Sequence, residues 1–149
     1  MVEPPAILLI EDEPLLLQNL QILLQHEGYR VRATCDGAAG IKQLKAQAFD
    51  LVITDLVMPG IDGFQVLDYL KFHCPQTVVL TVTGYLSSES ASEARRRGAY
   101  DNLTKPFDYH LLKTTIERAL QKARRQKSSR PDKRTEAWGE RAEQIQRAD

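Results

Sequence analysis

The chain has 149 residues, of which 42% are hydrophobic and 27% charged, a composition typical of one globular domain. Twenty basic and twenty acidic residues cancel, and no apolar run approaches the ~20 residues of a membrane span, so we expect no membrane-spanning helix and no membrane partner. Cys35 and Cys74 have neither metal-ligand nor redox-pair spacing, so we expect reduced thiols and a cytoplasmic location.

The charge is unevenly placed along the chain. From Gln121 onward nine basic residues stand against five acidic ones, which leaves residues 1–120 with a net charge of −4. An acidic site is therefore expected in the body of the protein. The basic end could contact nucleic acid, but we favour a solvated helix end or a linker.

Short apolar runs alternate with helical patterns along the chain, beginning with the strand AILLI at 6–10. The other predicted strands cover 29–34, 50–54, 77–82 and 99–103. The predicted helices cover 14–28, 38–48, 64–73, 87–98 and 108–127. Five strands that are each followed by a helix predict an α/β fold with a parallel sheet covered on both faces.

Local signals mark several boundaries. Pro14 suits the first position of a helix, Asp36 suits a helix cap, and Pro59 with Gly60 predicts a turn after the third strand. In the last helix, apolar spacing predicts a buried stripe made of Leu111, Leu112, Thr115, Ile116, Ala119 and Leu120.

The pattern changes at about Ser128 to a highly charged segment that contains the single tryptophan, Trp138. We therefore divide the chain into a domain of residues 1–127 and a basic, charged linker or tail of residues 128–149, with at most a weak helix. The tail has no DNA-binding motif, so we do not expect nucleic acid as a partner of this chain alone.

Ligands of an open parallel sheet bind at the carboxyl ends of its strands, so the residues that follow each strand indicate function. In chain order these residues are Glu11 and Asp12, Asp55, Thr83, and Lys105. We expect three acids, a hydroxyl and an amine to meet at one edge of the sheet.

The electrostatic repulsion among these acids can be estimated. Two carboxylates about 4 Å apart near a protein surface repel by roughly 4 kcal/mol at an effective dielectric constant of about 20. A trio reaches the order of 10 kcal/mol, which is comparable with the stability of a whole domain. A divalent cation offsets this repulsion, and Mg²⁺ takes carboxylates together with phosphate oxygens and water. The set of groups is typical of phosphoryl transfer.

Four segments carry a family resemblance: LLIEDEP, DLVITDLVMPGIDGF, TVTGY and LTKPFD. In this order and separation they resemble the receiver domain of two-component response regulators, from about Ala6 to Lys122. The resemblance implies a flavodoxin-like (βα)₅ fold, a doubly wound five-stranded parallel sheet in three layers with strand order 2-1-3-4-5.

By this resemblance Asp55 is the phosphoacceptor, which takes a phosphoryl group from the phosphohistidine of a sensor histidine kinase or a phosphotransfer protein. The resemblance also implies a Mg²⁺ ion held by Asp12, Asp55 and the backbone carbonyl of Val57. Glu11, where receivers more often carry aspartate, would act through a metal-bound water.

The resemblance gives Lys105 and Thr83 the role of binding two different phosphoryl oxygens. Gly84 would leave the backbone beside the phosphate unobstructed, and the peptide bond between Lys105 and Pro106 is expected to be cis. Receivers usually place Tyr, Phe or His at the switch position that Asn102 occupies here. Since asparagine is small and polar, we expect a response mainly through backbone shifts of residues 84–88.

These inferences together predict a phosphorylation-dependent signalling switch that assists its own Mg²⁺-dependent phosphorylation and dephosphorylation and is not an enzyme in the usual sense. The signal would pass to the surface formed by 87–98, 99–103 and 108–127. The same surface could form a homodimer, and an output domain could follow Asp149.

Three other functions fit parts of the pattern. An aspartyl-phosphate phosphatase carries its nucleophile after the first strand with a second aspartate two residues later, which EDEP does not match. A flavodoxin-type module needs a phosphate-cradling loop there, where this chain has acids. A pseudo-receiver would act only as an interaction surface, and the complete set of groups at the strand ends argues against it.

Overall fold

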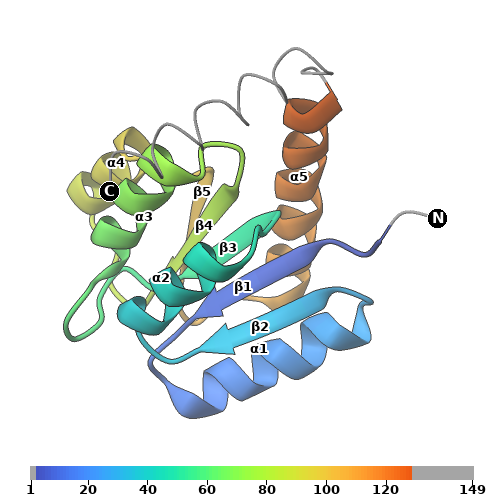
Figure 1. Ribbon diagram of the computed structural model, residues 1–149. Coiled ribbons are helices and arrows are strands. Elements are labelled where there is room, and N and C mark those ends of the chain that lie inside the picture. The colour runs from blue at the N-terminus through green and yellow to red at the C-terminus, as the bar shows by residue number, and fades with distance from the viewer. Residues whose placement is uncertain (1–2, 129–149) are drawn as a thin grey trace.

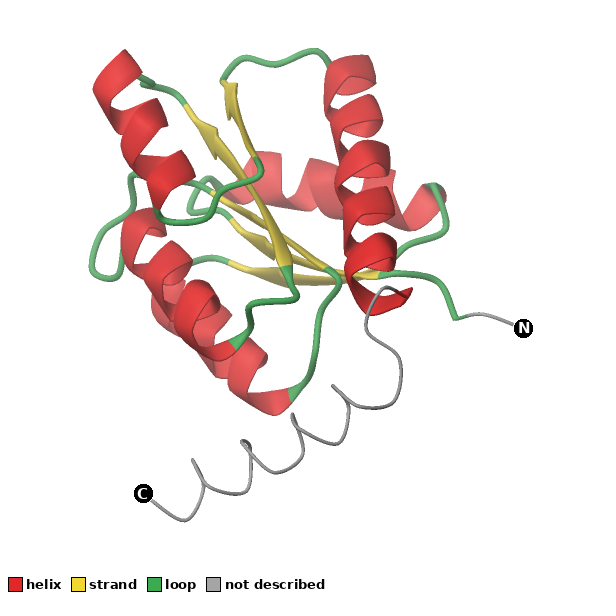
Figure 2. Ribbon diagram, turned by 90° about the horizontal axis from the view of Figure 1, so that it is seen from above, coloured by secondary structure: helices red, strands yellow, loops and turns green. Residues whose placement is uncertain are grey.

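The computed structural model describes residues 3–128, which form one parallel sheet between two layers of helices (Figures 1 and 2). The strands are β1 (Ala6–Ile10), β2 (Arg30–Thr34), β3 (Leu51–Thr54), β4 (Val78–Thr83) and β5 (Asp101–Thr104). The helices are α1 (Pro14–His26), α2 (Gly37–Ala46), α3 (Gly63–His73), α4 (Ser88–Arg96) and α5 (Tyr109–Ser128). The strand order is β2-β1-β3-β4-β5, so the predicted flavodoxin-like fold is confirmed.

The core has two halves, one on each face of the sheet. Side chains of a strand point alternately to opposite faces, and β1 shows this directly. Ile7 and Leu9 join the half covered by α1 and α5, whereas Leu8 and Ile10 join the half covered by α2, α3 and α4. Both faces of β1 are thus buried, which explains its uninterrupted apolar sequence.

The predicted helix starts agree with the structure where the sequence carries capping residues. Pro14 is the first residue of α1, and the Asp36 carboxylate accepts the backbone N–H of Ala39 at the start of α2, with an N···O distance of 2.7 Å. Ser87 caps α4 by accepting the N–H of Ser90 at 3.0 Å. These local signals fix where the chain leaves the carboxyl edge of the sheet.

The predicted buried stripe of α5 is wrong at one residue. Leu111 is 50% exposed. The buried line of the helix passes through Leu112, Ile116, Ala119 and Ala123. Thr115, one turn later on the same side of the helix, is buried, so the exposure of Leu111 reflects its position in the first turn of α5.

Among the described residues, no helix is both long enough and apolar enough to cross a bilayer. The predicted tail of residues 128–149, including Trp138, lies outside the described residues apart from Ser128 at the end of α5.

Candidate functional site

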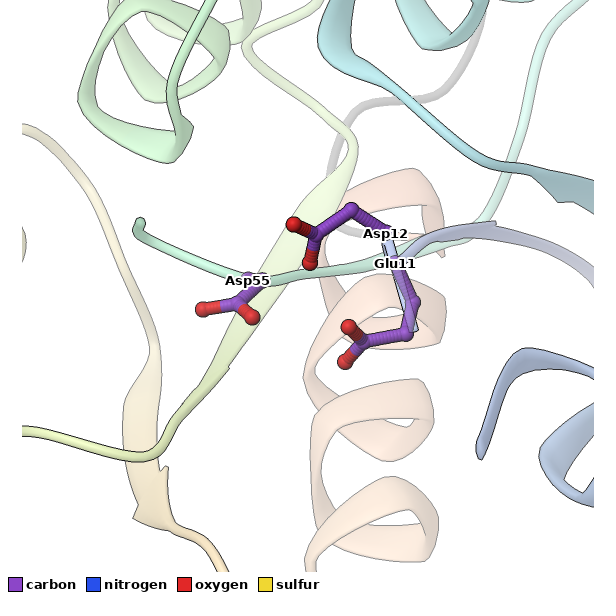
Figure 3. A group of neighbouring side chains, drawn as sticks. All are labelled: Glu11, Asp12 and Asp55. Carbon is purple, nitrogen blue, oxygen red and sulfur yellow. The ribbon is translucent and has the colours of Figure 1, made fainter. Parts of the chain in front are cut away.

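Three carboxylates meet where β1 and β3 end (Figure 3). The parallel register pairs Ile10 with Thr54, so the residues that follow these two strands emerge side by side. One carboxylate oxygen from each of Glu11, Asp12 and Asp55 lies within 4.8 Å of the others. We call these three residues the acidic cluster. Glu11 and Asp55 are buried, whereas Asp12 is exposed.

Lys105 supplies positive charge to the acidic cluster from the end of β5. Its Nζ lies 2.6 Å from Glu11 Oε1 and 2.9 Å from Asp55 Oδ2. Burial opposes the ammonium charge, but the hydrogen bonds that Lys105 donates to the two carboxylates raise its pKa above the usual value. Lys105 is therefore a cation at neutral pH, held on the phosphoacceptor position predicted from the sequence.

Both oxygens of Glu11 are engaged. Oε1 contacts Lys105, and Oε2 accepts the backbone N–H of Glu13 with an N···O distance of 3.1 Å. Burial raises the pKa of Glu11, and the bonds from Lys105 and Glu13 oppose that rise. The carboxylate of Glu13 also lies 3.6 Å from Lys105 Nζ.

Asp55 is fixed by the backbone around it. Its N–H donates to the carbonyl of Ile10 at 3.0 Å, and its Oδ1 accepts the N–H of Val57 at 3.2 Å. Val57 itself is 66% exposed. Further along this loop, Gly60 has a φ of 74°, a left-handed conformation that suits the turn expected at Pro59 and Gly60.

Gly63 is a residue of this site that sequence reasoning missed. A Cβ at this position would lie 2.2 Å from the carbonyl oxygen of Asp55 and 2.6 Å from the Cα of Leu56. Only glycine lets α3 start directly against the loop that carries Asp55. The signal lies in the segment PGIDG, in which only the first glycine was needed to predict the turn.

Thr83 lies at the end of β4 and is 1% exposed. Its Oγ1 donates to the carbonyl of Tyr85 over 3.5 Å, at the outer limit of a hydrogen bond, so the hydroxyl is weakly held. Gly84 is exposed, and an added Cβ there would meet no atom within 4 Å. The peptide bond between Lys105 and Pro106 is cis.

Asn102 contacts different partners from the residues of the acidic cluster. In the register of β4 with β5 it pairs with Thr81, whose buried Oγ1 donates to Asn102 Oδ1. Asn102 Nδ2 donates to the carbonyl of Ala91 in α4 over 3.3 Å. The structure thus places Asn102 between the sheet and α4.

The donor set fits a hard divalent cation. Three carboxylates share one close ammonium, that of Lys105, so negative charge is in excess at the cluster. The ligand atoms are oxygens, which Mg²⁺ and Ca²⁺ prefer.

Comparison with known proteins places this geometry in a family. Residues 7–117 match the model of the response regulator receiver domain. The transcriptional regulatory protein ZraR of Escherichia coli K12 is 40% identical over 114 residues, which are 76% of this chain and 26% of ZraR. The nitrogen assimilation regulatory protein NtrX of Azorhizobium caulinodans is 33% identical over 79% of this chain and 26% of its own length. The chain spans about a quarter of the length of these curated relatives.

Solved structures agree with the sequence comparison. The signal receiver domain of a LuxO-type repressor protein from Vibrio parahaemolyticus superposes with a TM-score of 0.81 at 27% identity, over 87% of this chain and 99% of that one. The beryllofluoride-activated dimer of the NtrC4 receiver domain has a TM-score of 0.75 at 30% identity, over 79% and 98% of the two chains.

Proposed function

Because this chain belongs to the response regulator receiver domain family, we propose that it is a phosphorylation-dependent switch in which Asp55 accepts a phosphoryl group from a sensor histidine kinase or a phosphotransfer protein. The observation that carries this proposal is the position of Asp55. It lies in the acidic cluster with its Oδ2 2.9 Å from the ammonium of Lys105. A buried carboxylate beside the Lys105 ammonium and beside a site for a divalent cation has the groups that phosphoryl transfer needs.

In the proposed reaction a carboxylate oxygen of Asp55 forms the new P–O bond while the P–N bond of the donor phosphohistidine breaks. The leaving histidine nitrogen keeps the electron pair. Lys105 would neutralise charge on the phosphoryl oxygens. Glu11 holds it in position, with an Nζ···Oε1 distance of 2.6 Å. The weak bond from Thr83 to the carbonyl of Tyr85 leaves its hydroxyl free to turn to another phosphoryl oxygen.

Asp12, Asp55 and the carbonyl of Val57 would hold Mg²⁺, and Glu11 would contribute through a bound water. When bound, this ion offsets the charge of the carboxylates and of the incoming phosphoryl group. Glu11 also orients Lys105, because both of its oxygens are already used by Lys105 and the N–H of Glu13.

The output of the switch would be a change in the surface formed by α4, β5 and α5. Thr83 lies at the end of β4, directly before the loop that leads to α4, so a movement of its hydroxyl acts on that loop. We propose the same surface for homodimer formation. An output domain beyond Asp149 fits the relatives, which are about four times as long as the matched segment.

The test is phosphorylation with acetyl phosphate and Mg²⁺. The wild type gains one acid-labile phosphoryl group, whereas Asp55→Asn gains none at that position. Asp36→Asn is the matched control, because Asp36 is an exposed helix cap and asparagine caps a helix equally well. Undiminished labelling of Asp55→Asn at the original site would contradict the proposal. Steady hydrolysis of diffusible phosphate monoesters over many turnovers would favour a phosphatase instead.

A further inference from the structure

The polar contacts of helix α4 with α3 and β5 lie mainly at its C-terminal end. Arg97 Nη1 lies 3.0 Å from Asp68 of α3, and Arg95 Nη2 lies 3.2 Å from Asp101 of β5. The ammonium of Lys71 in α3 donates to the carbonyl of Arg96 over 3.1 Å. Three contacts from two neighbouring elements thus hold one end of the helix.

The N-terminal end of α4 is stabilised locally. Ser87 and Ser90 cap each other, with the N–H of each donating to the hydroxyl of the other over 3.0 Å. This capping box orders the first turn of the helix but connects it to no other element. The loop before it contains Tyr85, which is 77% exposed.

Asn102 makes the hydrogen bonds that connect the middle of α4 to the sheet. Its Oδ1 accepts from the buried hydroxyl of Thr81, and its Nδ2 donates to the carbonyl of Ala91. The carbonyl of Ala91 can only accept, which fixes the orientation of the amide. An aromatic ring or an apolar side chain at position 102 could not make both bonds.

Thr81 connects this amide to the phosphorylation site. Thr81 and Thr83 lie two residues apart on β4, so their side chains point to the same face of the sheet. Both are buried, at 0% and 1% exposure. A displacement of β4 near Thr83 therefore reaches Asn102 through Thr81.

We propose that Asn102 is a latch that holds the middle of α4 on β4 in the unphosphorylated protein, and that its bond to the Ala91 carbonyl opens when Asp55 is phosphorylated. The helix then pivots about the end held by Arg95, Arg96 and Arg97. The second half of this statement depends on the function proposed above, whereas the resting latch does not. One net hydrogen bond changes an opening equilibrium by about fivefold, so the latch can both hold and release.

The resting latch is tested by amide hydrogen exchange followed by NMR, without phosphate donor. Asn102→Asp keeps the acceptor for Thr81 but removes the donor to Ala91 and places a carboxylate against that carbonyl. We expect amides 91–93 to exchange about fivefold faster or more. Thr81→Val, which is isosteric, removes the other bond and should act in the same direction. The control is Asn19→Asp, the same change at an exposed position of α1, with no effect on α4.

The opening is tested by adding Mg²⁺ and beryllofluoride to the same proteins. In the wild type the exchange of amides 91–93 should rise toward the rate of Asn102→Asp, whereas that variant should change little further. Acetyl phosphate should still label Asp55 in Asn102→Asp to the wild-type level.

The outcomes separate the two proposals. Absence of labelling at Asp55 in every protein would contradict the proposed function, while faster exchange in Asn102→Asp would still support the resting latch. Unchanged exchange in both Asn102→Asp and Thr81→Val would overturn the latch itself. An equal rise on activation in wild type and Asn102→Asp would overturn its release by phosphorylation.

Discussion

The charge of Asp12 should destabilise the fold without a cation and stabilise it when Mg²⁺ is bound. It is the exposed member of the acidic cluster and has Glu11 and Asp55 as close negative neighbours. Without a cation, Asp12→Asn removes repulsion and should stabilise the fold by about 1 kcal/mol or more. With Mg²⁺ the order should reverse, because the wild type gains binding free energy that the variant largely loses.

Thermal melts of wild type and Asp12→Asn in EDTA and in saturating Mg²⁺ measure both effects. Asp36→Asn makes the same change of charge at a helix cap outside the acidic cluster, and it should shift neither pair of melts appreciably. An Asp12→Asn variant that is less stable than wild type in EDTA means that the three acids do not repel one another as their separation suggests.

The sequence predicted the members of the site better than their contacts. The rule that strand ends of a parallel sheet share one edge was enough to bring together Glu11, Asp12, Asp55 and Lys105. The rule could not show that one oxygen of Glu11 contacts Lys105 and the other accepts the N–H of Glu13. Those contacts depend on the length of the Glu11 side chain and on the path of the turn that follows it.

Asn102 shows the same limit. The sequence identified it as a departure from the receiver pattern, but its partners, Thr81 and the carbonyl of Ala91, come from two other elements. Sequence spacing alone does not show which residues of β4 and β5 are paired. It also does not show how closely α4 packs on the sheet.

At the scale of elements, the start of α3 is tied to the loop that carries Asp55. Gly63→Ala places a methyl group 2.2 Å from the Asp55 carbonyl oxygen, and backbone atoms cannot give way as a flexible side chain can. Either α3 or the loop must shift, with an expected loss of about 1–3 kcal/mol in unfolding free energy. The shift should also slow labelling of Asp55 by acetyl phosphate.

Gly84→Ala is the matched control for this effect, because an added Cβ at position 84 meets no atom within 4 Å. In urea denaturation, the unfolding free energy of Gly84→Ala should lie within a few tenths of a kcal/mol of the wild-type value, whereas Gly63→Ala should show the larger loss. Equal stabilities of the two variants would mean that α3 does not press on the Asp55 loop.

The elements themselves followed from hydrophobic patterning, and β5 is the strand whose bounds were predicted least well. β1, β3 and β4 are buried on both faces and were recognised as apolar runs. β2 and β5 lie at the edges of the sheet. β2 was predicted to within one residue, whereas β5, predicted at 99–103, spans Asp101–Thr104 and is only partly buried. Leu111 was misassigned because apolar spacing does not show how far the sheet extends along a helix.

At the scale of the whole molecule, the acidic cluster and the proposed output surface occupy different parts of the sheet. The carboxyl edge holds the acidic cluster, and the surface of α4, β5 and α5 extends away from it along the edge strand β5. Asn102 belongs to β5 and contacts Thr81 of β4 and Ala91 of α4. By the proposals above, phosphorylation of Asp55 would alter this surface through Thr81 and Asn102.

The last prediction concerns self-association through that surface. Lys122 of α5 lies 5.3 Å from the ring centroid of Tyr100, beside β5, and Arg118 is one turn earlier on the same exposed side of α5. If activation exposes a self-complementary face here, Mg²⁺ and beryllofluoride should raise the mass in sedimentation equilibrium from 16.9 kDa toward twice that value. Asp55→Asn should remain a monomer. Replacing Arg118 and Lys122 by glutamate should block association while leaving labelling of Asp55 unchanged, and a dimer that survives these replacements would place the interface on another face.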